Sequence, residues 1–92
     1  MATVTINSDL SANPSTVTIK GGETVTWEGD IDFAIHLPAP YTNPNIAPKA
    51  GGKWGGTSGA FPNQPGKKYV VHYTVTANGQ MHDPDIEVLP NP

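Results

Sequence analysis

The sequence predicts an all-β domain, a sandwich of short strands, and three observations support this prediction. Apolar and polar residues alternate over short runs rich in valine and threonine, which is typical of strands with one buried face. No segment shows the spacing of an amphipathic helix. Turn-forming pairs such as Asn13-Pro14, Gly21-Gly22 and Asn78-Gly79 separate the runs. Together these features indicate about seven to eight strands in an antiparallel sandwich or barrel.

The alternating rows locate the individual strands and the expected core. In chain order, the residues predicted to be buried are Val4 and Ile6, Val17 and Ile19, Val25 and Trp27, Phe33 and Ile35, the row Tyr69, Val71, Tyr73 and Val75, and finally Ile86 and Val88. Leu37 continues the row that begins at Phe33. His36 and His72 have the opposite parity, so we expect both to face outward. In the stretch YTVTANGQMHDPD we expect a strand end, an Asn-Gly turn and a strand start.

Residues 38–66 interrupt this rhythm. They contain six prolines, six glycines and no acidic residue, and they predict one long irregular loop. This segment carries Tyr41, Trp54 and Phe61. In one interpretation the three aromatic side chains fold back and cover the open end of the sandwich. In the other, the flexible frame GGKWGG presents Trp54, with Tyr41 and Phe61 as further contacts, to a partner protein or a glycan.

Length and composition exclude several classes of function. A chain of 92 residues is expected to form a single domain spanning residues 1–92. The absence of cysteine excludes disulfides, thiolate metal sites and a cysteine nucleophile. The net charge of −3 and the lack of arginine argue against nucleic-acid binding. No apolar run is long enough to span a membrane, and no signal peptide is recognisable, so we expect a cytoplasmic protein, or a periplasmic or extracellular one whose leader has been removed.

Two stretches of the chain resemble the cupredoxin family. The stretch NPSTVTIKGGETVTW looks like that family's second and third strands, with a lysine-glycine turn and an aromatic residue at the end. The stretch PGKKYVVHYTVTANGQMHDPDIEV is similar to its last two strands. Outside residues 38–66, the resemblance covers most of the sequence. It implies a cupredoxin-like Greek-key sandwich of two sheets.

The resemblance also allows a comparison with the family's blue copper site, which uses two histidines, a cysteine thiolate and a weak axial methionine. His36 lies near the position of one histidine, and Met81 can match the methionine. Tyr73 falls where the cysteine belongs, and Thr76 or Ala77 stands where the second histidine belongs. We therefore expect no type 1 copper site, and fold resemblance alone does not carry electron transfer over to this chain.

A different metal site remains an alternative. In a cupredoxin-like fold, His82 would lie in a loop at the end of the sandwich that also gathers Met81, His36 and the carboxylates Glu28, Asp30, Asp32 and Asp83. Imidazole with carboxylates suits copper(II), nickel or zinc, and carboxylates alone suit calcium. The same residues also fit an ordinary solvated acidic rim. No serine shows a nucleophile-elbow context, and we identify no catalytic constellation.

The sequence therefore predicts a protein that is not an enzyme, a non-catalytic binding or interaction module with no cofactor. The alternative is a copper-binding or copper-handling protein with a non-blue site at His36, Met81 and His82. The partner-binding residues would be Trp54, Tyr41 and Phe61, and the partner is a protein or a glycan that the sequence does not name. The oligomeric state stays open.

Overall fold

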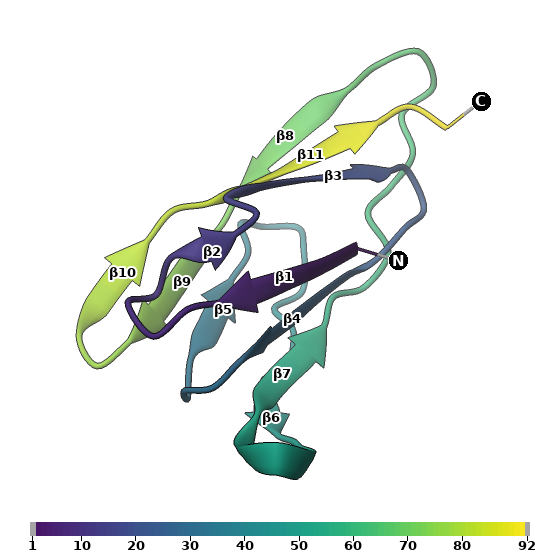
Figure 1. Ribbon diagram of the computed structural model, residues 1–92. Coiled ribbons are helices and arrows are strands. Elements are labelled where there is room, and N and C mark those ends of the chain that lie inside the picture. The colour runs from purple at the N-terminus through teal and green to yellow at the C-terminus, as the bar shows by residue number, and fades with distance from the viewer. Residues whose placement is uncertain (1, 92) are drawn as a thin grey trace.

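The computed structural model describes residues 2–91, and their secondary structure consists of strands and one 3₁₀ turn (Figure 1). The all-β prediction is confirmed. The strands are β1 (Ala2–Ile6), β2 (Ala12–Asn13), β3 (Thr16–Lys20), β4 (Val25–Gly29), β5 (Ala34–His36), β6 (Ala47–Pro48), β7 (Trp54–Thr57), β8 (Tyr69–His72), β9 (Thr74–Ala77), β10 (Gln80–His82) and β11 (Asp85–Leu89), and the 3₁₀ turn is η1 (Ala50–Gly52).

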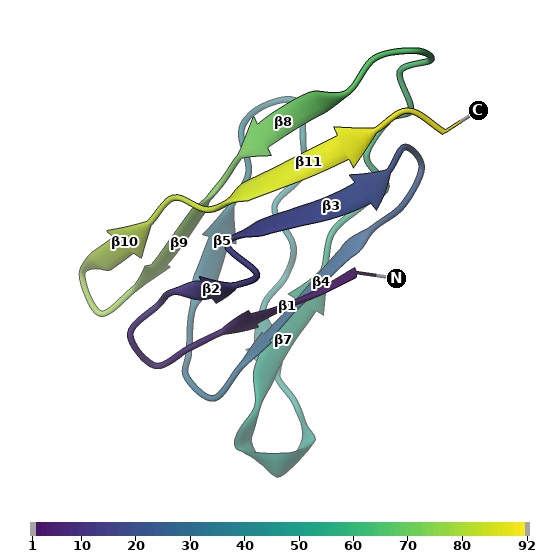
Figure 2. The ribbon, with the colours of Figure 1, turned by 45° about the horizontal axis from the view of Figure 1, so that its top comes forward.

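The strands form two layers that face each other across one core (Figures 1 and 2). One layer is a sheet with the strand order β2-β1-β4-β7-β6. The other combines the sheets β3-β11-β8 and β10-β9-β5, which are joined because β8 runs into β9 with only Tyr73 between them. In Figure 2, β8, β11 and β3 lie side by side above β1, β4 and β7.

The strand count differs from the expected seven or eight for two reasons. The described residues form eleven strands, but β2 and β6 have only two residues each. In addition, β8 and β9 continue one another and correspond to the single long row that the sequence predicted from Tyr69 to Val75. The structure therefore contains the predicted strands together with short pairings, and with β7, which alternation did not reveal.

Two strand pairs are parallel, although the strand spacing suggested an antiparallel sandwich or barrel. β1 pairs with β4 in parallel, and β3 pairs with β11 in parallel. The chain crosses from one layer to the other between β2 and β3, and it returns before β4. Such a crossover brings a later strand beside an earlier one in the same direction, whereas a tight hairpin brings it back antiparallel.

The buried core agrees closely with the predicted rows. All the residues predicted to be buried are at most 5% exposed except Tyr69, which is only partly buried and packs against the core. Leu10 and Phe61 join the core although the sequence analysis did not place them there. Burial of this apolar surface, worth about 25 cal/mol per Å², is the main source of stability for such a domain.

Residues 38–66 are more ordered than the expected irregular loop, because they contain β6, η1 and β7. β7 pairs with β4 inside the first sheet. Gly55 and Gly56 are buried. Neither position has room for a side chain. A Cβ on Gly55 would lie 2.6 Å from the Trp27 carbonyl oxygen, and one on Gly56 would lie 2.4 Å from the Asn45 carbonyl oxygen. These two glycines therefore permit close backbone approach in a strand, and the expectation of a flexible GGKWGG frame is wrong for them.

The β9–β10 hairpin confirms the turn predicted at Asn78-Gly79. Both residues have positive φ, 50° and 77°, as a type I′ turn requires. Met81 and His82 follow this turn on β10 and pair with β9. The expectation that His82 lies in a loop is therefore wrong. Within residues 2–91, no helix is both long and apolar enough to cross a membrane.

Candidate functional site

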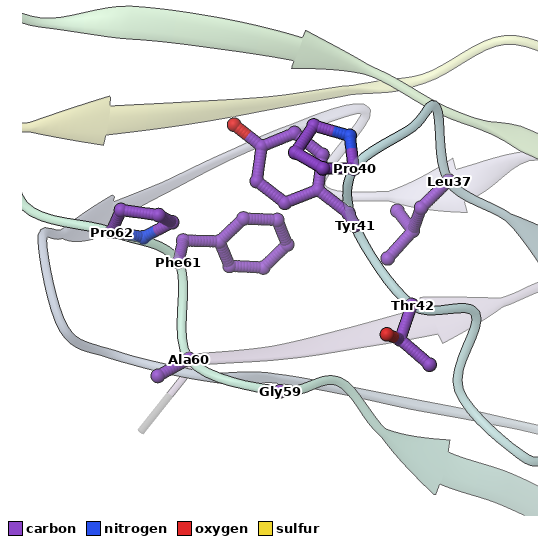
Figure 3. Close-up of a pocket in the computed structure, with 8 residues that line it drawn as sticks. All are labelled: Leu37, Pro40, Tyr41, Thr42, Gly59, Ala60, Phe61 and Pro62. Carbon is purple, nitrogen blue, oxygen red and sulfur yellow. The ribbon is translucent and has the colours of Figure 1, made fainter.

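An apolar pocket lies where residues 37–42 meet residues 59–62, and its volume is about 210 Å³. Figure 3 shows the rings of Tyr41 and Phe61 next to each other, with proline and leucine side chains around them. Its lining consists of Leu37, Pro40, Tyr41, Thr42, Gly59, Ala60, Phe61 and Pro62. None of these side chains carries a formal charge, so the pocket suits an apolar group.

Hydrogen bonds hold both walls of the pocket in place. On one wall, the Leu37 N–H donates to Asn43 Oδ1 at 2.6 Å, and the Tyr41 N–H donates to the Pro38 carbonyl at 3.0 Å. On the other wall, the Phe61 N–H donates to the Glu23 carbonyl at 3.0 Å, and the Gly22 N–H donates to the Phe61 carbonyl at 2.7 Å. The first wall is therefore held by bonds within residues 37–43, and the second wall by backbone bonds to the turn at residues 22–23.

The two aromatic residues of the pocket differ in accessibility. Phe61 is 1% exposed and belongs to the core, whereas Tyr41 is only partly buried. Their ring centroids lie 5.2 Å apart at an interplanar angle of 47°, a tilted arrangement that aromatic pairs favour. Phe61 thus forms the floor of the pocket, and Tyr41 is its more accessible aromatic side chain. These positions fit the interpretation in which the aromatic residues cover the open side of the sandwich.

Tyr69 connects the pocket to strand β8. Its hydroxyl donates to the Pro62 carbonyl at 2.6 Å. Burial, followed by interaction with Tyr41, raises the pKa of Tyr69 to about 12. The hydroxyl is therefore protonated throughout the physiological range and can keep donating this bond. The first residue of β8 is in this way tied to the wall of the pocket.

Trp54 lies apart from the pocket. It is the first residue of β7, where it pairs with Gly29 on one side and Pro48 on the other. Its side chain is partly buried and packs against the core. The structure therefore brings together Tyr41 and Phe61, two of the three aromatic residues predicted to contact a partner, and leaves Trp54 at a separate place.

The predicted metal-binding residues lie on β5 and β10, on either side of β9. Met81 pairs with Thr76, and His36 Nε2 lies 3.2 Å from Thr76 Oγ1, so Met81 and His36 border the same threonine. His82 pairs with Val75. Because successive residues of a strand point to opposite faces, Met81 and His82 lie on opposite faces of β10.

His82 has different neighbours from the other two candidates. It borders a small pocket together with Ser11, Ser15 and Asp83. Asp9 lies within electrostatic range of His82, but hydrogen bonds from Ser11 are the main reason that the pKa of Asp9 is lowered. Over residues 2–91, no group of three or more histidine, aspartate or glutamate side chains could hold a metal ion. The three predicted ligands therefore do not converge on one point.

The acidic end of the sandwich contains an ion pair that the sequence analysis did not identify. Lys53 Nζ lies 2.6 Å from Asp30 Oδ1, and both side chains are exposed. Hydrogen bonding with Asp30 raises the pKa of Lys53. The lysine comes from the glycine-rich stretch in the middle of residues 38–66. The pair compensates part of the negative charge there.

Tyr73 occupies the position where the resemblance would place the copper-binding cysteine. It is 1% exposed, and its ring makes an edge contact with Trp27 at a centroid distance of 5.4 Å. Burial raises the pKa of Tyr73, so its phenol stays protonated and is a poor metal donor. The residues present do not fit a type 1 copper ion.

No protein-family model matches the sequence, and no curated protein shows significant similarity to it. Function is therefore inferred from the geometry of these sites.

Proposed function

We propose that this protein is a non-catalytic, cupredoxin-like binding module that receives an apolar side chain of a partner protein in the pocket between Tyr41 and Phe61. The observation that carries the proposal is the pocket itself. No charged side chain lines it, hydrogen bonds hold both of its walls, and it lies in a domain whose net charge is −3. Two observations support a Greek-key sandwich that serves as a rigid scaffold. The two stretches that resemble cupredoxins follow each other in the order found in that family, and the sheets form two layers.

The size and lining of the pocket favour a side chain over a sugar. Its volume of about 210 Å³ is smaller than the roughly 300–1,000 Å³ typical of small-molecule sites and suits one amino-acid side chain. A sugar ring presents several hydroxyl groups that need polar partners, and unpaired polar groups are costly to bury. The lining offers Thr42 and the Tyr41 hydroxyl as polar side-chain groups and is otherwise apolar. A glycan is therefore the less suitable occupant.

Titration with small probes, followed by the amide chemical shifts of the protein in NMR spectra, tests the proposal. The probes are the N-acetyl amides of leucine, phenylalanine and tryptophan, with glucose and N-acetylglucosamine as the glycan arm. We expect the apolar amides to shift residues 37–42 and 59–62 at millimolar concentration. If none of the apolar amides shifts these residues, or if only the sugars do, the proposal is wrong.

A pocket-filling variant provides the control. Gly59 lines the pocket, and a Cβ there would meet no atom within 4 Å, so Gly59→Leu adds a bulky side chain at the pocket rim without distorting the backbone. It should abolish the shifts. Gln80→Leu adds the same side chain at an exposed position of β10 and should leave them unchanged.

The alternative function is copper binding without a blue site, and the observation that favours it is the common position of His36 and Met81 beside Thr76. Equilibrium dialysis against Cu(II) and Cu(I) tests this alternative. Stoichiometric uptake that is lost in His36→Ala would support it. Uptake lost only in His82→Ala would assign the ion to the opposite face of β10, and the absence of uptake would end the alternative.

A further inference from the structure

The outer edge of β8 is an open sheet edge next to the proposed pocket. β8 is the last strand in the order β3-β11-β8, and Figure 2 shows its other side facing away from β11. The neighbouring strand β5 pairs with β9 and stops at His36, opposite Thr74. Two residues later comes Pro38, which has no N–H to donate to a sheet. Among residues 2–91, no strand therefore pairs with this edge of β8.

The direction of the backbone groups on β8 follows from its pairings. The Tyr73 N–H donates to the Pro84 carbonyl, on the β11 side. Because backbone groups alternate in direction along a strand, the N–H and C=O groups of Val70 and His72 point to the open side. Both residues are exposed, and Val70, 46% exposed, is one of two large exposed hydrophobic residues among those described. These groups are available to a further strand.

The open edge and the pocket are continuous. Leu37, the residue after β5, lines the pocket, and Tyr69, the first residue of β8, donates a hydrogen bond to Pro62 in the pocket wall. A strand added beside β8 would continue the path that β5 follows beside β9 as far as His36. Its inward side chains would therefore point towards the pocket. Peptide sites of this type combine backbone hydrogen bonds with a pocket for one side chain.

We propose that β8 accepts an extended peptide of a partner protein as an additional antiparallel strand, with one apolar side chain of that peptide in the Tyr41–Phe61 pocket. This inference rests on the proposed function and names its ligand. Antiparallel pairing is the more stable type, and it is the type β8 already forms with β11.

The charges along the edge favour one sequence polarity for this peptide. Lys67 and Lys68 precede β8 and are exposed, and Lys68 Nζ also lies 4.0 Å from Glu87 on β11. Asp83 and Asp85 lie near the other end of β8, where they contact Thr74 and His72 from the side of β10 and β11. In the antiparallel direction, the C-terminal end of the peptide lies beside the two lysines. The ligand should therefore be acidic at its C-terminal end and basic at its N-terminal end.

A second copy of this chain fits the site less well. In an antiparallel pairing of β8 with β8 of another copy, the inward side chains of the added strand would be Val71 and Tyr73. Both are already buried in the core of their own copy, so neither could enter the pocket. In this pairing a second copy cannot fill the edge and the pocket together, whereas a free peptide can.

The test uses an acetylated, amidated heptapeptide with the order lysine, threonine, leucine, threonine, leucine, aspartate, aspartate. In a strand beside β8 its leucines face inward and its threonines pair with Val70 and His72. We expect binding to slow amide hydrogen exchange at Val70 and His72 and to shift the amides of residues 37–42 and 59–62.

N-methylation of the threonines removes the donors that face β8 and should weaken binding about tenfold or more. N-methylation of the leucines, whose N–H groups face away, is the matched control and should preserve it.

Three results would overturn the inference. Equal binding of the two methylated peptides, with pocket shifts but unchanged exchange at Val70 and His72, would refute strand addition and leave the pocket proposal intact. Slowed exchange at both residues without pocket shifts would refute the combined site, and the leucine amide titration then decides on the pocket separately. Slowed exchange that depends on protein concentration without peptide would assign the edge to a second copy. A peptide with its lysine and aspartates exchanged tests the polarity and should bind more weakly.

Discussion

Replacement of Gly56 by alanine tests the finding that the GGKWGG stretch ends in a buried strand. In the structure Gly56 lies on β7 opposite Trp27 of β4. A Cβ at this position would lie 2.4 Å from the carbonyl oxygen and 3.0 Å from the carbonyl carbon of Asn45. Both atoms belong to the backbone, so a rotamer change cannot relieve the contact. β7 or the residues before β6 must move.

The expected cost follows from two opposing effects. Overpacking of a well-packed site typically costs about 1–3 kcal/mol. Alanine also restricts the unfolded chain more than glycine does, which offsets about 0.4–1 kcal/mol. We therefore expect Gly56→Ala to lower the free energy of unfolding by about 1–2 kcal/mol. For a domain of this size, each kcal/mol corresponds to about 4–8 °C in Tm.

Urea denaturation followed by tryptophan fluorescence, together with thermal melting followed by circular dichroism, measures this change. Gly59→Ala is the matched control, because a Cβ there meets nothing within 4 Å, and it should be neutral or slightly stabilising. If Gly56→Ala were as stable as the wild type, Gly56 would lie in a flexible loop, and the pairing of β7 with β4 would be wrong.

Three further substitutions test the pocket and the core. Phe61→Ala should lower the free energy of unfolding by about 3–5 kcal/mol, because Phe61 is 1% exposed; a loss below about 1 kcal/mol in urea titrations would place Phe61 outside the core. The raised pKa of Tyr69, about 12 against an ordinary 10.0, stabilises the fold fully below pH 10 and loses this effect as the pH rises through 12. Tyr69→Phe should therefore flatten the alkaline decline in stability, and an unchanged decline would assign it to other groups. Trp54→Phe should leave leucine amide binding unchanged, since Trp54 does not line the pocket; weakened binding would place Trp54 at the site.

The sequence was sufficient to predict the core because burial in a sheet leaves a periodic signal. The long row from Tyr69 to Val75 shows this most clearly, since its side chains alternate regularly between the core and the outer face. Phe61 escaped the same reasoning, because it is held by two backbone hydrogen bonds to the turn at residues 22–23 and belongs to no alternating row. A buried residue anchored through tertiary contacts has no local pattern from which it could be predicted.

Strand β7 was missed for a related reason. Gly55 and Gly56 carry no side chain, so the strand shows no alternation, and glycine pairs ordinarily indicate turns. The two glycines allow the backbones of Asn45 and Trp27 to approach closely, and Trp27 lies far from them in the sequence. The pocket could not be predicted for both of these reasons: its residues belong to no alternating row, and its shape depends on contacts between segments that are distant in sequence. The proline and aromatic content of residues 38–66 signalled a surface of interest, but the pairing of Tyr41 with Phe61 depends on how the two ends of that segment return to the sandwich.

The position of Tyr73 allows a direct test of the relation between this fold and copper chemistry. If only the missing sulfur prevented a blue site, Tyr73→Cys would create one on addition of cupric ion. We expect no intense visible absorption, because Met81 and His82 lie on opposite faces of β10 and His82 is directed away from His36. A thiolate would then face at most one of the other donors. Circular dichroism must show that the variant folds, since removal of a large buried side chain costs stability. An intense blue colour in the folded variant would show that the donors converge, and the geometry described for His36, Met81 and His82 would be wrong.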